Sequence, residues 1–428
     1  MLLLGYTFQN WKASPKGLGM NDDIETLYED AMFALGDDDL DDATDTLNQM
    51  LEIAPDAPQT LEVQGDVARW REQPEEAERH YRRLLTSASD EFWKGVAHTS
   101  LASLWAAEGQ NKSVREQFVL AVKAYRACDA DDRALSVYAA LASFDVEQGE
   151  FEFAAESLRS AVVLFEASDD ADEMEPEIGT VQLMLGTCYR QQGKLDLARQ
   201  TLNQALKLFQ KLEEPDECAN VLDALGVIEQ IQGHYSAAEE LHLKAVSMNE
   251  AIDFQEGLST NYGNLTILNI HRGEWDQAAN WAGRAYLIDK ENEDENGVAH
   301  YHLLMGEIEF ERGNLTKAED HLQQALEMYQ DCGDAEDMIS VQGKTAVLYR
   351  QQGKLEEASE IDERILVDAE RMGHGDGIAA ILEDLAQVRK AQGRTEEARD
   401  FWQRSLAMYE QLGAERIVEE VRRELTEL

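Results

Sequence analysis

Apolar residues recur along this chain with the spacing of amphipathic helices. Between residues 180 and 212, Val181, Leu185 and Tyr189 predict one helix of about four turns. Gly193 follows, and a glycine ends a helix readily because it takes the left-handed conformation without a Cβ clash. A second helix is predicted from its apolar residues, which are Leu195, Leu197, Ala198, Leu202, Ala205, Leu206 and Phe209. We therefore predict two helices joined by a short turn.

This helical pair repeats with a period of 40 residues. The turn glycines are Gly193, Gly233, Gly273, Gly313, Gly353 and Gly393. An alanine follows each of them by five residues, from Ala198 to Ala398, and a small residue precedes each by seven, from Gly186 to Ala386. Small side chains at fixed positions allow two helices to pack closely. A pair this short cannot bury both faces alone, so the pattern predicts a stack of hairpins.

Four further helical pairs are predicted between residues 22 and 165. Ala43 and Ala77 are 34 residues apart, which indicates a shorter period at this end, and later turns fall at Gly109 and Gly149. Residues 413–428 predict one amphipathic helix that caps the last hairpin, with Ile417, Val418, Val421 and Leu425 on one side. The expected architecture is about ten hairpins and a capping helix, without strands.

The same pattern sets the expected domain organisation. We expect residues 1–21 to form a disordered leader. The alternative is that the true start of the chain is Met20. Residues 22–165 predict an N-terminal block of about four repeats, and residues 178–412 a C-terminal block of about six. Between them lies the acidic segment 166–177, which ends after Pro176. We interpret this segment as a hinge or as a simple loop insertion that leaves the stacking unchanged.

The residues of the fifth pair resemble the tetratricopeptide repeat (TPR). Leu185, Gly186 and Tyr189 match its L-G-x-x-Y run, and the turn glycine, Ala198 and Ala205 follow at the expected distances. The 40-residue spacing is similar to that of kinesin light chain and of the Leu-Gly-Asn repeat adaptors. The resemblance implies an all-α fold, a right-handed superhelical α-solenoid. The chain departs from the motif where Glu229, Asn269, Glu309 and Arg389 replace the tyrosine.

The charge of the chain restricts its partners. It has 86 acidic and 38 basic residues, a net charge of −48. Such a field repels nucleic acid and anionic membranes, so neither is expected as a partner. The acidity is typical of a protein kept soluble in high salt, and also of an ordinary acidic protein with a solvated outer face. No apolar run is long enough for a membrane span, and we expect a cytoplasmic protein.

The sequence contains no pattern typical of an enzyme. The P-loop, G-x-G-x-x-G, H-E-x-x-H and G-x-S-x-G motifs are absent, and the four cysteines have no metal-site spacing. His300 and His302 are two residues apart, which directs them to different faces of a helix and favours surface or packing roles. We therefore predict no catalytic residue, no metal and no cofactor.

The resemblance to TPR proteins implies that the first helix of each pair lines a concave groove. Inner positions then fall 13, 10, 6 and 3 residues before each turn glycine. The predicted peptide-binding residues are Arg190, Asn220, Asp223, Ile267, Ile270, His300, Leu303, Phe310 and Arg350, with Asn264 beside them. This set suits a peptide that has apolar anchors and carboxylates. In the alternative interpretation, Ile267, Leu303 and Phe310 pack against neighbouring repeats.

Together these features predict a non-catalytic scaffold or adaptor that binds a peptide segment of a partner protein in its groove. The alternative is a signalling regulator whose TPR sensor responds to a peptide or another ligand. The identity of the partner and the oligomeric state have no signal in the sequence.

Overall fold

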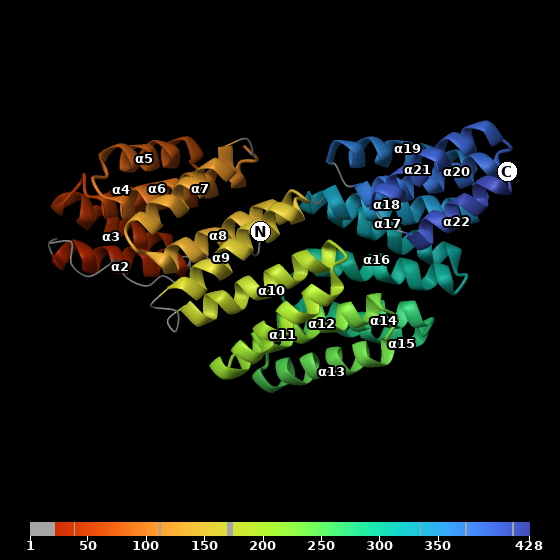
Figure 1. The fold of residues 1–428 in the computed structure, drawn as a ribbon, viewed down its shortest axis with the longest axis horizontal. Coiled ribbons are helices and arrows are strands. Elements are labelled where there is room, and N and C mark those ends of the chain that lie inside the picture. Colours follow the sequence, from red (N-terminus) through yellow and green to blue (C-terminus); the bar gives the residue numbers. More distant parts are fainter. Residues whose placement is uncertain are drawn as a thin grey trace. The chain divides into compact units, whose positions relative to one another are not determined.

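The computed structural model describes residues 22–37, 39–110, 113–168, 174–333, 335–372, 375–412 and 415–428. Within these ranges the chain forms 21 α-helices and no strand, which confirms the predicted all-α fold of hairpins with a final single helix (Figure 1). The proposed leader, residues 1–21, lies outside the described residues.

The chain divides into two compact units, Met1–Glu213 and Glu214–Leu428. The first unit contains five hairpins. Its helices are α2 (Asp22–Gly36), α3 (Leu40–Ile53), α4 (Pro58–Trp70), α5 (Pro74–Ser87), α6 (Glu91–Ala107), α7 (Val114–Ala127), α8 (Asp131–Glu147), α9 (Phe151–Ala167), α10 (Glu175–Gln191) and α11 (Leu195–Leu212).

The second unit contains the other five hairpins and the final helix. Its helices are α12 (Pro215–Ile231), α13 (Tyr235–Ile252), α14 (Gln255–Arg272), α15 (Trp275–Glu291), α16 (Glu295–Glu311), α17 (Leu315–Cys332), α18 (Ala335–Gln351), α19 (Leu355–Met372), α20 (Gly375–Ala391), α21 (Thr395–Leu412) and α22 (Glu415–Thr426).

The proposed hinge does not coincide with this division. Helix α9 extends to Ala167 and α10 begins at Glu175, so helices occupy both ends of the segment 166–177. Residues 169–173 lie outside the described residues. The division between the two units falls one hairpin later, after Glu213. A hinge at residues 166–177 stays a prediction.

The small residues of the repeat are the points where the two helices of a hairpin meet. Ala198, five residues after the turn, is fully buried, and so is Ala398 in the last hairpin. Gly186 faces Leu202, and a Cβ at Gly186 would lie 2.6 Å from Leu202 Cγ. Gly193 has φ of +70°, the left-handed conformation that ends the first helix. The spacing of small residues in the sequence therefore predicts both the turn between the two helices and the contact between them.

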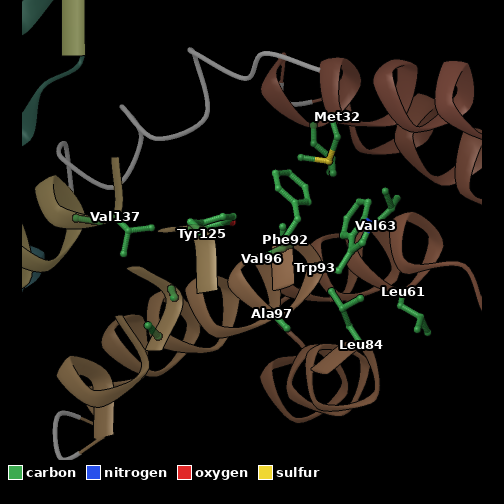
Figure 2. Close-up of a cluster of buried hydrophobic side chains, with 14 of the residues drawn as sticks. Met32, Leu61, Val63, Leu84, Phe92, Trp93, Val96, Ala97, Tyr125 and Val137 are labelled. Atoms are coloured by element: carbon green, nitrogen blue, oxygen red, sulfur yellow. The ribbon is translucent and has the colours of Figure 1, made fainter. Parts of the chain in front are cut away.

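The first unit has a continuous core that joins successive hairpins. Trp93 of α6 is buried in it, and its ring makes edge contacts with Tyr28 of α2 and with Phe92. Trp93 and Phe92 are labelled in Figure 2. Figure 2 also shows Leu61 and Val63 of α4 on the same side of the cluster as Leu84 of α5. Tyr28, Leu84 and Trp93 of this cluster come from three successive hairpins, so the core forms between hairpins as well as within them.

The last helix covers the end of the second unit. Val418 and Val421 of α22 are buried against Trp402 and Tyr409 of α21. The other face of α22 carries exposed charged residues, among them Glu419, Glu420 and Arg422. No helix in the described ranges is both long and apolar enough to span a membrane.

Candidate partner-binding face

Within the second unit, α12, α13 and α14 carry a group of mostly buried polar side chains that we call the Asp223 network. It consists of Asp223 on α12, His242 and Asn249 on α13, and Asn261 and Asn264 on α14. Every member except Asn264 is at most 5% exposed. Burying a polar group is costly unless it is hydrogen-bonded, so the bonds inside this network favour one arrangement of the three helices. Among the described residues, no group is hydrogen-bonded to His242 Nε2 or to Asn249 Oδ1.

Asp223 is the centre of that network. Its Oδ1 lies 2.5 Å from His242 Nδ1, while its Oδ2 accepts hydrogen bonds from the side-chain amides of Asn261 and Asn264. The bond from Asn264 Nδ2 is 3.1 Å long. Asn249 Nδ2 donates to Asn261 Oδ1 over 2.8 Å. One carboxylate therefore orients side chains from both hairpins.

His242 can occupy the hairpin interior because of the glycine opposite it. A Cβ at Gly226 would lie 2.6 Å from His242 Cε1. His242 stands nine residues after its turn glycine, where Leu202 and Leu322 stand in other hairpins. A polar residue at this apolar repeat position is the signal that could have revealed the network from the sequence. The predicted set included Asp223 and Asn264. It did not include His242, Asn249 or Asn261.

Beside the network, the surface of α14 is open. A Cβ at Gly263 would meet no atom of the described residues within 4 Å, and Thr260 one turn earlier is exposed. Asn264 is partly exposed, and its amide nitrogen is held by Asp223. On α12, Asn220 is exposed and donates a hydrogen bond of 3.4 Å to Glu217 Oε2. Thr260, Gly263 and Asn264 therefore leave polar surface and open space on α14.

The structure places the predicted apolar anchors mainly in contacts between helices. Ile270 is 8% exposed and packs with Leu304 and Ile308 of α16. Leu303 is 5% exposed and lies in the cluster around Leu322 and Tyr329. Ile267 and Phe310 are partly buried against these same two clusters. The four side chains therefore offer a partner much less surface than the groove prediction assumed.

The basic side chains of this face are already paired with acids. Lys344 Nζ of α18 lies 2.6 Å from Glu307 Oε2 of α16, and Arg350 Nη1 lies 2.6 Å from Asp384 Oδ1 of α20. Burial and the charge of Lys344 lower the pKa of His300, which favours its neutral form. A carboxylate from a partner would have to compete with these internal acids.

Arg190 belongs to the first unit, so it cannot be assigned to the same face. It lies on α10, partly exposed, and its Nη1 is 3.4 Å from Gln191 Oε1. Burial lowers the pKa of its guanidinium. Within the second unit, the structure brings Asp223 and Asn264 together and leaves Asn220 exposed on α12.

Comparisons with known families agree with the hairpin pattern. The tetratricopeptide repeat model matches residues 177–251, 257–331 and 337–411, and a second model of the same repeat matches residues 139–213. The chain belongs to the tetratricopeptide repeat family. The TPR matches cover more than half of the sequence and all five hairpins of the second unit.

Solved structures show the same TPR fold. The apo form of RapI has a TM-score of 0.59 and 16% identity, and the match covers 75% of this chain and 90% of RapI. Aspartyl phosphate phosphatase F from Bacillus subtilis has a TM-score of 0.55 and 11% identity, with coverage of 84% and 96%. At these identities the likeness shows the fold alone. No curated protein matches the sequence.

Proposed function

We propose that this TPR protein is a non-catalytic scaffold that binds an extended segment of a partner protein. The binding surface is the first-helix face of the second unit, around Gly263 and Asn264. TPR membership supports a role in protein interaction. The observation that carries the location is the Asn264 amide, held by Asp223 beside the open space at Gly263.

The chemistry of this area suits the main chain of a peptide. A side-chain amide can both donate to a carbonyl and accept from an N–H, and its orientation here is set before any partner arrives. The missing side chain at Gly263 lets another backbone approach closely. Apolar anchors and acidic groups on the partner would add to this contact, the latter by displacing Asp384 from Arg350.

The decisive experiment compares two asparagines of one hairpin. Asn264→Ala removes the proposed contact, whereas Asn280→Ala changes an exposed residue on α15. We expect a partner recovered from the native lysate with the intact chain to be lost with Asn264→Ala, by roughly 10-fold or more in affinity. It should be retained with Asn280→Ala. Equal recovery with the two variants would contradict the proposed face.

A second candidate function is a regulator that changes conformation when a short peptide binds. The Asp223 network favours it, because a ligand that moves Asn264 would disturb contacts on α12 and α13 as well. This candidate predicts a ligand-dependent change in the small-angle scattering curve. A curve that stays unchanged while the peptide saturates the protein would leave the scaffold as the better description.

A further inference from the structure

A pair of histidines outside the proposed binding face meets inside the hairpin α16–α17. His302 of α16 and His321 of α17 are both partly exposed, and their Nδ1 atoms are 3.0 Å apart. The tyrosine rings of Tyr286 and Tyr301 lie around them, with Tyr301 in edge contact with both imidazoles. Nothing in the proposed scaffold role requires two imidazoles at this place.

The position of this pair recurs in the fold. His302 stands 11 residues before its turn glycine, Gly313, and His321 stands eight residues after it. In the first unit the same two positions around Gly109 hold His98 and Gln117, whose Nδ1 and Oε1 atoms are 2.8 Å apart. A single histidine with a glutamine therefore satisfies this contact. The hydrogen bond does not require a second imidazole, and that imidazole supplies a second nitrogen able to coordinate a ligand.

From this geometry we propose that His302 and His321 form a chelating site for a borderline divalent transition-metal ion, with water in the remaining coordination positions. With metal–nitrogen bonds of about 2.05 Å, nitrogens 3.0 Å apart subtend about 94° at the metal. That angle fits cis ligands of a tetragonal Ni²⁺ or Cu²⁺ ion. A tetrahedral Zn²⁺ ion would need the nitrogens to separate by about 0.3 Å.

The electrostatic surroundings favour this chemistry. Burial lowers the pKa of both imidazoles, so the neutral form that binds metals predominates at neutral pH. Glu309 and Asp320 add negative potential around His321, which Lys317 partly offsets. On binding, each Nδ1 lone pair turns to the metal, and the proton held between the rings moves to an Nε2 atom. No proton is lost from a neutral pair.

The site has two protein ligands only. Among the described residues, no group of three or more His, Cys, Asp or Glu side chains is arranged to hold a metal. The nearby Glu309 is engaged with Arg312 and Asn314, so it does not complete the set. Such an open site binds metal reversibly, and its selectivity comes from imidazole ligands. Mg²⁺, which prefers oxygen ligands, should not compete.

The test uses Ni²⁺ titrated into the full chain by calorimetry, with excess Mg²⁺ to occupy surface carboxylates. We expect one saturable Ni²⁺ per chain. His321→Gln should reproduce the His98–Gln117 contact, keep the fold by circular dichroism, and weaken Ni²⁺ binding by roughly 10-fold or more, because losing a ligand costs at least as much as losing its supporting residue. Undiminished binding in His321→Gln would overturn the proposal, since Ni²⁺ would then be bound elsewhere.

A second variant moves the site. Adding Gln117→His to the His321→Gln chain places two imidazoles at the matching positions of the α6–α7 hairpin. Restored saturable Ni²⁺ binding would support the claim that this pair of positions is sufficient for chelation. A doubly substituted, folded chain that binds no better than His321→Gln alone would contradict it.

Discussion

Among single residues, His242 and Asp362 occupy the same repeat position, nine residues after a turn glycine, where Leu202, Leu322 and Trp402 are buried in other hairpins. His242 has a carboxylate partner in Asp223. Asp362 is 2% exposed, and within the described part of the chain no group is hydrogen-bonded to its Oδ1. A buried carboxylate without full pairing is expected to take up a proton more readily than a carboxylate in water.

Burial, followed by the charge of Asp384, raises the pKa of Asp362 from 3.8 to about 8, although Arg350 and Arg389 oppose the shift. A raised pKa means that the unfolded chain loses this proton first as the pH rises. The second unit should therefore become less stable between about pH 4 and pH 8. This trend is opposite to that of a carboxylate stabilised by an ion pair.

Asp362→Leu should remove the pH-dependent loss of stability caused by this carboxyl. It also places at this position an apolar residue, as other hairpins have there. We expect a gain on the order of 1–4 kcal/mol at pH 8 and little change at pH 4. Urea unfolding of the full chain at both pH values measures it, with the exposed Asp400→Asn as control. An Asp362→Leu chain with the pH dependence of the parent would show that this carboxyl is not the cause.

At the scale of the helix, two glycines on neighbouring first helices have opposite roles. Gly226 of α12 faces His242 at close range, and Gly263 of α14 faces open space. Gly226→Ala should destabilise the second unit by about 1–3 kcal/mol because the imidazole, fixed by Asp223, cannot retreat freely. Gly263→Ala should instead stabilise it by about 0.5–1 kcal/mol, since alanine favours the helix.

Chemical denaturation of the two variants measures this difference. The Gly263→Ala variant also separates stability from binding: a more stable chain with weaker partner binding is expected if this surface lies under the peptide. If the two substitutions had equal effects on the free energy of unfolding, the assigned contacts of Gly226 would be incorrect.

The helical hairpins could be predicted almost completely from the sequence, but the binding face could not. Gly193, Ala198 and their repeats fix the turn and the contact within a hairpin, because those positions tolerate few other residues. The inner positions have no such restriction. Counting from Gly273 and Gly313 selected Ile270 and Leu303, yet whether a side chain faces solvent or the next hairpin depends on how hairpins stack. The 40-residue period alone does not determine which inner side chains face solvent.

For the whole molecule, the net charge of −48 is the dominant electrostatic feature. Ion pairs such as Lys344–Glu307 are attractive, but exposed pairs contribute at most about 1 kcal/mol each, and acids outnumber bases 86 to 38. Repulsion should therefore dominate at low salt.

We expect the thermal midpoint to rise as NaCl increases toward roughly 1 M, where the screening length falls to about 3 Å. Each kcal/mol of repulsion removed should raise the midpoint by roughly 2–4 °C for units of this size. Scanning calorimetry across a salt series measures the effect, with sucrose as a control for excluded-volume stabilisation. A midpoint that falls with NaCl would mean that the attractive pairs dominate.

The claim on which the proposed function depends is that a partner segment lies across the first-helix face of the second unit. Photo-crosslinking tests it most directly. A photoreactive residue is placed at the exposed Thr260 of α14 or, as control, at the exposed Gln277 of α15, and each protein is illuminated with its partner bound. We predict crosslinks to one continuous partner segment from position 260 and few from position 277. Crosslinks of equal yield from both positions, or from 277 alone, would contradict the proposed face.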